Sequence, residues 1–158
     1  MADRIRVAVV TTTRAEFHIL EPLLDALERN RSFSLQLIVS GTHLSKSHGS
    51  TIEIVRAHFP GLSNVDAQFE SSDPPALIRS CGLLAAGVAA QLHRNQADVL
   101  VVLGDRFELL SVAQAALLLR VPIAHLHGGE TTLGAIDDLV RNALTQLASL
   151  HLVAADIF

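Results

Sequence analysis

The chain has 158 residues, of which 49% are hydrophobic and 18% are charged, and its formal net charge is −4. This length suits one domain with a hydrophobic core of its own. The apolar balance is typical of an α/β domain whose strands are buried on both faces. The acidic charge and the lack of a Lys/Arg-rich run exclude a nucleic-acid-binding surface.

The sequence also indicates the compartment. Cys81 is the only cysteine, which excludes an internal disulfide and favours a reducing environment. The N-terminus lacks the apolar segment of a signal peptide. Charged or polar residues interrupt each apolar stretch before it reaches the roughly 20 residues of a membrane span. We therefore expect a cytoplasmic protein with no membrane partner.

Strand and helix patterns alternate along the whole chain. Strands are expected over Ile5–Val10, Phe33–Val39, Val65–Phe69, Val99–Leu103, Ile123–His127 and Leu150–Ala154. Helices are expected over Pro74–Arg94, Arg106–Arg120 and Ile136–Ser149. An earlier helix carries a leucine stripe, and Pro22 makes it either start near Glu21 or bend there. This alternation predicts a parallel sheet with right-handed crossovers in one Rossmann-like domain, residues 1–158.

Polar residues follow four of the expected strands. Ligands of open α/β sheets bind at the carboxyl ends of the strands, where such residues converge. Asp137 and Asp138 open the helix that comes next. The strand-end residues that we single out as candidates for a site are Arg14, His43, Asp105, Arg106, His127, Gly128, Gly129 and Glu130.

The acidic candidates also have structural explanations. Asp105 with Glu108 has the form of a capping box, which is about as plausible as catalysis for that residue alone. Asp137 and Asp138 suit the first turn of a helix, and Asp137 can pair with Arg141 one turn on. Ser50 with Glu53 also has the form of a capping box.

Histidines and glycines leave further alternatives. His125 and His127 alternate along a strand and would share one face. With Glu130 and Asp105 nearby they could hold zinc, and His43 and His48 could add ligands. No HExxH or paired-cysteine pattern supports a metal, and we expect none. Gly128-Gly129 permits either a tight turn or a close approach of a ligand to the backbone, and we prefer the second.

Several nucleotide and hydrolase motifs are missing. Thr11 to Arg14 occupies the turn where a dinucleotide-binding G-x-G-x-x-G would stand. The chain also has no Walker A lysine loop and no G-x-S-x-G nucleophile elbow.

Four motifs occur in a characteristic order: Thr13–Phe17, Ser40–Ser45, Gly104–Glu108 and His127–Arg141. Together they resemble the hydrolysing UDP-N-acetylglucosamine 2-epimerases that feed sialic acid and other nonulosonate biosynthesis. The resemblance covers nearly the whole chain, and the last two motifs are the specific ones. Thr12, His18 and His48 depart from the pattern. The family usually has glycine at the first position, often glycine at the second, and commonly an aromatic residue at the third.

The resemblance implies an α/β fold of two Rossmann-like domains, as in the GT-B glycosyltransferases, with the active site in the cleft between them. This chain would supply the N-terminal domain, and the C-terminal nucleotide-binding domain would be absent from it. No cofactor is implied, and the family commonly forms homodimers or homotetramers.

The implied reaction converts UDP-N-acetylglucosamine into UDP and N-acetylmannosamine through a glycal. Carboxylates exchange protons with the sugar, and the resemblance assigns them to Asp105, Glu130 and Asp137 or Asp138. Arg14 and Arg106 would position these acids or offset the diphosphate charge. His43, with the His127-Gly128-Gly129 segment, would bind the substrate.

Other functions stay open. A sister enzyme could act on a UDP-linked 2,4-diacetamido sugar or on GDP-N-acetylglucosamine. A non-catalytic sugar-nucleotide-binding domain and a metal hydrolase are further alternatives.

Overall fold

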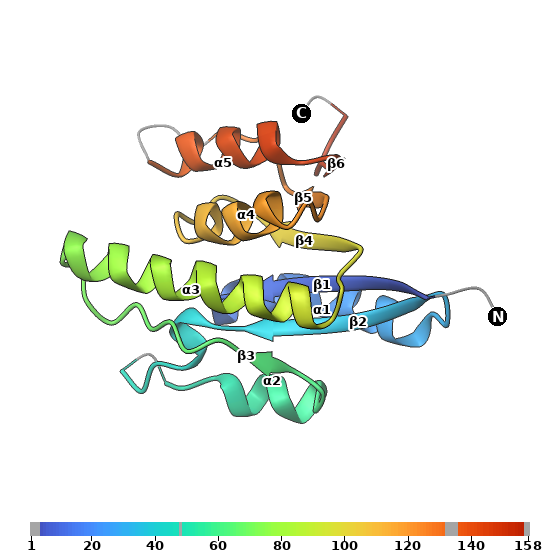
Figure 1. Cartoon of the computed structure of the whole chain (residues 1–158), viewed down its shortest axis with the longest axis horizontal. Helices are drawn as coiled ribbons and strands as arrows, with labels where there is room; N and C mark the ends of the chain where they lie inside the picture. Colours follow the sequence, from blue (N-terminus) through green and yellow to red (C-terminus); the bar gives the residue numbers. More distant parts are fainter. Residues whose placement is uncertain (1–3, 48, 132–135, 157–158) are drawn as a thin grey trace.

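The computed structural model describes residues 4–47, 49–131 and 136–156, and it contains one parallel six-stranded sheet (Figure 1). The strands are β1 (Ile5–Thr11), β2 (Phe33–Val39), β3 (Ser63–Asn64), β4 (Val99–Leu103), β5 (Ile123–Leu126) and β6 (Leu150–Leu152). Their order is β3-β2-β1-β4-β5-β6, and each neighbouring pair is parallel. The predicted α/β class is therefore confirmed, and the order reverses between β1 and β4, where ligands bind in such sheets.

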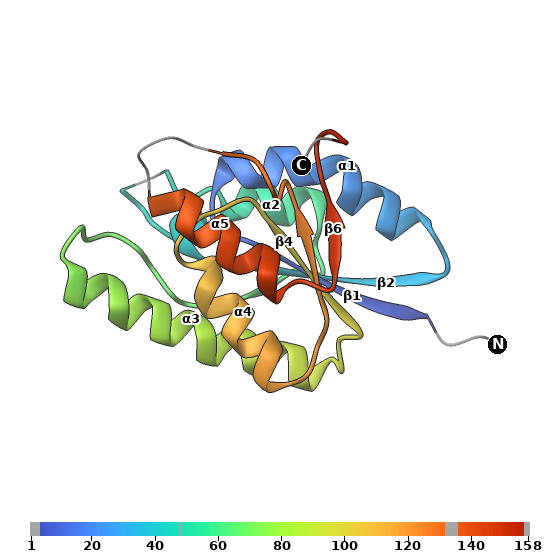
Figure 2. The same ribbon diagram turned by 90° about the horizontal axis from the view of Figure 1, so that it is seen from above.

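Helices cover both faces of the sheet (Figure 2). Apolar side chains of α1 (Arg14–Arg29) and α2 (Ile52–His58) pack in one hydrophobic cluster with one face. Those of α3 (Pro74–Arg94), α4 (Leu109–Leu118) and α5 (Ile136–Leu147) pack in a second cluster on the other face. A short 3-10 helix, η1 (Gly41–His43), follows β2. The polar residues of the carboxyl edge thus lie between two apolar layers.

Helix α1 begins eight residues before Pro22. Thr13 caps it, since its hydroxyl accepts the Glu16 N–H at 3.3 Å and the Glu16 carboxylate accepts the Thr13 N–H at 3.1 Å. This reciprocal capping box and the buried apolar stripe hold the helix through the proline. The predicted start near Glu21 is therefore wrong.

Strand β3 is shorter and earlier than the predicted Val65–Phe69. The Val65 N–H still bonds the Val39 carbonyl at 3.0 Å, but the Ala67 N–H turns back to the Val65 carbonyl at 2.9 Å and ends the ladder. Gly87 of α3 lies against this segment, and a Cβ there would stand 2.3 Å from the Val65 side chain. The buried alternation of Val65 and Ala67 comes from this close packing, not from strand pairing.

The start of helix α4 also differs from the prediction. Helix α4 begins at Leu109, not at Arg106, because residues 104–108 form the loop that carries the charged residues of the motif.

Helix α3 is long and apolar enough to cross a membrane by length and composition alone. Its residues Leu84, Val88 and Leu92 are instead buried in the hydrophobic cluster shared with α4 and α5.

Candidate active site

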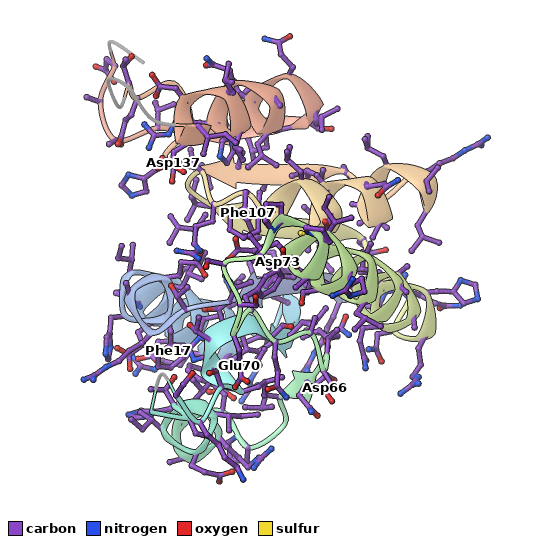
Figure 3. All side chains as sticks on the ribbon, turned by 90° about the vertical axis from the view of Figure 1, so that its left-hand side faces the viewer. Phe17, Asp66, Glu70, Asp73, Phe107 and Asp137 are labelled. Atoms are coloured by element: carbon purple, nitrogen blue, oxygen red, sulfur yellow. The ribbon has the colours of Figure 1, made fainter. Side chains whose placement is uncertain are left out.

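A pocket of about 260 Å³ opens at the carboxyl ends of β1, β4 and β5. Figure 3 looks onto this edge, with Asp137 at the beginning of α5. The described lining residues are Thr13, Ala15, Glu16, Ile19, Leu103, Gly104, Asp105, Arg106, His127 and Glu130. The convergence predicted for Asp105, Arg106, His127 and Glu130 is therefore present.

Larger hollows lie at the opposite edge of the sheet, around Arg6, Gln96 and Asp98. There the Arg6 guanidinium and the Asp98 carboxylate already pair with each other at 2.7 Å. Amino ends of parallel strands do not normally bind ligands, whereas carboxyl ends do. The smaller pocket beside Asp105 is thus the candidate active site.

Arg141 joins the two acids that the sequence singled out. Its guanidinium bonds the Asp105 carboxylate and lies 3.8 Å from a Glu130 oxygen. The Arg141 side chain is 8% exposed, so water screens these contacts little. Among the described residues, the ion pairs of Arg141 go to Asp105 and Glu130, and not to Asp137 as predicted.

The predicted capping role of Asp105 is wrong. Glu108, not Asp105, occupies the N-cap position of α4, and its side chain makes no capping hydrogen bond. Gly104, with φ +82°, turns the chain at the end of β4 so that the Asp105 carboxylate reaches α5 instead. The Ser50–Glu53 box is also absent, since Thr51 precedes α2 and gives no side-chain cap.

The two histidines near β5 have different environments. His125 is buried, its Nε2–H donates to the Gly104 carbonyl at 2.7 Å, and burial lowers its pKa. His127 follows the strand with φ +59°, and its Nδ1 lies 2.9 Å from a Glu130 oxygen. The left-handed backbone at His127 ends the alternation that the sequence predicted for the pair.

Gly128 and Gly129 serve different needs. Gly129 has φ +81°, which a side chain would strain. A Cβ at Gly128 would stand 2.9 Å from His125 Nδ1 and 3.0 Å from the Thr145 hydroxyl. The space at Gly128 is thus taken by protein atoms, which does not fit the expected approach of a ligand there.

His43 does not lie at the surface of the site. Its side chain is fully buried, with Nε2 at 3.1 Å from the Thr11 hydroxyl and Nδ1 at 2.7 Å from the Thr51 hydroxyl. Burial lowers the pKa of His43 to about 4. The expectation that His43 contacts the substrate does not fit this position, because both ring nitrogens already have protein partners.

The remaining candidates differ in their position relative to the pocket. Arg14 is exposed at the start of α1, bonds His18 at 3.2 Å, and is outside the described lining of the pocket. Arg106 lines the pocket and bonds Glu108 at 2.6 Å. Burial lowers the pKa of Arg106, but the hydrogen bond and charge of Glu108, and then the charges of Glu16 and Asp137, raise it above its usual value.

Sequence reasoning missed Arg141 as a site residue, and it missed the buried acids Glu16 and Glu108. Their signal was their place in motifs already noticed, one turn after Asp137 and inside Thr13–Phe17 and Gly104–Glu108. Residues 132–135 of the last motif and His48 lie outside the described residues. Within the described part of the chain, no group of three His, Cys, Asp or Glu side chains is placed to hold a metal ion.

Comparison with known proteins assigns the family. Residues 25–157 match the family described as UDP-N-acetylglucosamine 2-epimerase. The chain belongs to the UDP-N-acetylglucosamine 2-epimerase family. A Campylobacter jejuni member, GDP/UDP-N,N'-diacetylbacillosamine 2-epimerase (hydrolyzing), is 35% identical over 153 residues, which are 97% of this chain and 40% of that protein. A Neisseria meningitidis UDP-N-acetylglucosamine 2-epimerase is 30% identical over 150 residues, 94% of this chain and 39% of that protein.

Solved structures of family members share the fold. UDP-GlcNAc 2-epimerase from Methanocaldococcus jannaschii superposes with a TM-score of 0.77 at 19% identity, over 96% of this chain and 40% of that one. The enzyme from Neisseria meningitidis bound to UDP-GlcNAc gives 0.76 at 16% identity, over 96% and 41%. The chain thus spans about 40% of its relatives' length and forms one Rossmann-like domain of their GT-B fold.

Proposed function

We propose that this chain is the N-terminal domain of a hydrolysing 2-epimerase that converts UDP-N-acetylglucosamine into UDP and N-acetylmannosamine. The observation that carries the proposal is the buried Arg141 guanidinium, which bonds Asp105 and approaches Glu130 beside the pocket. A buried cation that orders two carboxylates at a strand-end pocket suits proton exchange with a bound sugar. The remainder of the cleft belongs to the second domain of the full-length enzyme.

The chemistry needs two balanced steps. In the first, the C1–O bond to UDP breaks and a carboxylate takes the C2 proton, which leaves a glycal. In the second, water adds its hydroxyl at C1 while a proton reaches C2 on the opposite face. Carboxylates placed around the sugar also stabilise the positive charge that develops at C1.

From their surroundings we assign each acid a different role in the reaction. Arg141 holds the Asp105 carboxyl group beside the charge that develops at C1. Glu130 lies 2.9 Å from His127, whose ring is 43% exposed, so a proton can pass between Glu130 and solvent through the imidazole. The charge of Asp137 acts on Arg106, and we assign Asp137, in preference to Asp138, as the acid of the second step.

Arg106 is our choice for the diphosphate. It lines the pocket with its side chain 41% exposed, and guanidinium groups bind phosphate oxygens in pairs. Arg14, exposed at the N-terminus of α1, is free to add a longer-range positive charge for the same group. His43 supports the loop that follows β2 and makes no contact with the sugar.

A second candidate substrate has its own support. The Campylobacter jejuni relative, whose name gives a diacetylbacillosamine nucleotide, is 35% identical to this chain, against 30% for the Neisseria meningitidis enzyme named for UDP-N-acetylglucosamine. A UDP- or GDP-linked 2,4-diacetamido sugar would undergo the same reaction at C1 and C2. Identities of 30 to 35% do not separate the two substrates, and the pocket residues of this domain suit both.

Activity of the full-length protein tests the proposal. Incubation with each nucleotide sugar, followed by detection of free UDP or GDP and of the sugar product, identifies the substrate. In deuterated water the product should carry deuterium at C2, because the glycal is reprotonated from solvent. Binding of a nucleotide sugar with no release of nucleotide would contradict a catalytic role and indicate a binding domain.

A further inference from the structure

A buried hydroxyl joins two acids beside the pocket. The Thr12 hydroxyl lies 2.9 Å from a Glu16 oxygen and 2.9 Å from a Glu108 oxygen. Glu108 is 1% exposed and Glu16 is 8% exposed, so both carboxyl groups are inside the protein. Thr12 follows β1, Glu16 is in the first turn of α1, and Glu108 precedes α4. Three elements thus bring two acids to one hydroxyl.

The number of protons decides what this arrangement is. A threonine hydroxyl has one proton and can donate to one acceptor at a time. If both acids were ionised, one of the two short oxygen–oxygen contacts would have no proton in it and would be repulsive. We propose that Glu16 and Glu108 hold one proton between them through Thr12, and that this pair positions the Arg106 guanidinium at the mouth of the pocket.

Glu108 is the member of the pair that holds Arg106. Its Oε1 accepts the Arg106 Nε–H at 2.6 Å, which is a charge-assisted contact of the kind that favours a carboxylate. Glu16 is farther from that guanidinium, at 3.9 Å. The Thr12 hydroxyl therefore donates to Glu108 and accepts the proton of Glu16.

Several groups shift the pKa of Glu16, and they shift it in opposite directions. Burial raises the pKa of Glu16 most, and the charge of Glu108 raises it further. The backbone N–H and the hydroxyl of Thr12 lower it, as does the Arg106 charge. Burial is the largest of these effects. Within the described residues Glu16 Oε1 and Glu108 Oε2 both lack a hydrogen-bond partner, which disfavours two charged acids side by side.

The shared proton sets the charge beside the substrate. With one proton, Glu16, Glu108 and Arg106 together are neutral, whereas two ionised acids would leave a net negative charge beside a diphosphate. Among the described residues, both carboxylate contacts of Arg106 run through Nε, which leaves its two Nη groups for an anion. Glu16 and Glu108 are therefore positioning residues that act through Arg106, and this role rests on the function proposed above.

Two amide variants of the full-length enzyme separate the roles. Glu16→Gln replaces an uncharged acid with an uncharged amide, so KM for the nucleotide sugar should rise less than it does in Glu108→Gln. Glu108→Gln removes the carboxylate that holds Arg106, and KM for the nucleotide sugar should rise about tenfold with a smaller change in kcat. An equal rise in KM in the two variants would overturn the proposal, because that result is expected if both acids are ionised.

Infrared spectroscopy tests the proton without any need for activity. In full-length protein labelled with 13C-glutamate at neutral pH, the carbonyl stretch of a protonated glutamic acid should be present, lost in Glu16→Gln and kept in Thr12→Ser. Absence of the band in the wild-type protein, or its persistence in Glu16→Gln, would overturn the shared proton. If no nucleotide sugar is turned over, the proposed function fails while the infrared result still decides this inference.

Discussion

Polar side chains follow β1 and β2 just as they follow β4 and β5, yet the two pairs of strand ends use them differently. The first pair forms a buried half, which comprises Thr11, Ser40, His43 and Thr51 and whose side chains are 0 to 8% exposed. The second forms a charged half, which comprises Asp105, Arg106, His127, Glu130 and Arg141. All of these except Arg141 line the pocket, together with residues that follow β1. His43 is fully buried between two hydroxyls, whereas His127 is 43% exposed beside a carboxylate.

The comparison shows that a place at the carboxyl edge does not by itself make a residue catalytic. In the buried half each ring nitrogen of His43 has a protein partner, and none is left for a ligand. In the charged half the ion pairs leave carboxylate oxygens beside open space. Burial and partner geometry thus separate the residues that support the site from those that react.

Loss of an acid from the charged half should give the largest effect. In the full-length enzyme we expect Asp105→Asn and Glu130→Gln each to lower turnover at least about 100-fold, because each removes a group that exchanges protons or stabilises charge. Steady-state release of UDP measures this. Asp66→Asn, at an exposed acid far along the chain from the motifs, is the control and should keep its activity. Near-normal turnover in both site variants would show that the charged half is not catalytic.

Removal of the cation from the charged half should have the second-largest effect. Arg141→Gln leaves the Asp105 carboxylate without its buried partner, and we expect the free energy of unfolding to fall by about 2 kcal/mol. Urea denaturation of the 158-residue chain measures this change. The matched control is Arg29→Gln, since that guanidinium is 79% exposed in a surface pair and should cost less than about 0.5 kcal/mol. Similar losses in both variants would contradict the buried role of Arg141.

The buried half should respond to acid with a smaller effect. The pKa of His43 falls from 6.5 to about 4 in the folded chain, so the unfolded state takes up a proton first as the pH drops. Stability is therefore complete above about pH 6.5 and should decrease by about 1 kcal/mol between pH 7 and pH 5.5 on account of this group. Urea midpoints of wild type and His43→Gln measure the difference. If the variant lost stability just as steeply with acid, His43 would not be the cause.

The sequence predicted the architecture well because the physical signals were local and repeated. Alternating apolar strands and helical stripes determine a parallel sheet, and the strand ends bring Asp105 and Glu130 to one edge whatever the details of the loops. Of the two alternatives for the helix around Pro22, a start near Glu21 was wrong because the capping box of Thr13 and Glu16 decides where α1 starts.

Partners within the site could not be read from the sequence. Arg141 lies 36 residues from Asp105, and a local rule paired it with Asp137 one turn away. The burial of His43 likewise depends on Thr11 and Thr51, which only the folded chain brings to its two nitrogens. Choice among neighbouring partners is a tertiary property, and residue spacing does not determine it.

Gly41 in the buried half has a consequence for how this family is compared. With φ +64°, a Cβ there would stand 2.6 Å from the Thr12 carbonyl, so a larger residue would displace the chain that carries Thr12. Purifying selection should therefore act on Gly41 as strongly as on the acids of the charged half. An alignment would then show invariant residues in both halves. From invariance alone, a glycine that only supports the fold would be taken for a substrate-binding residue.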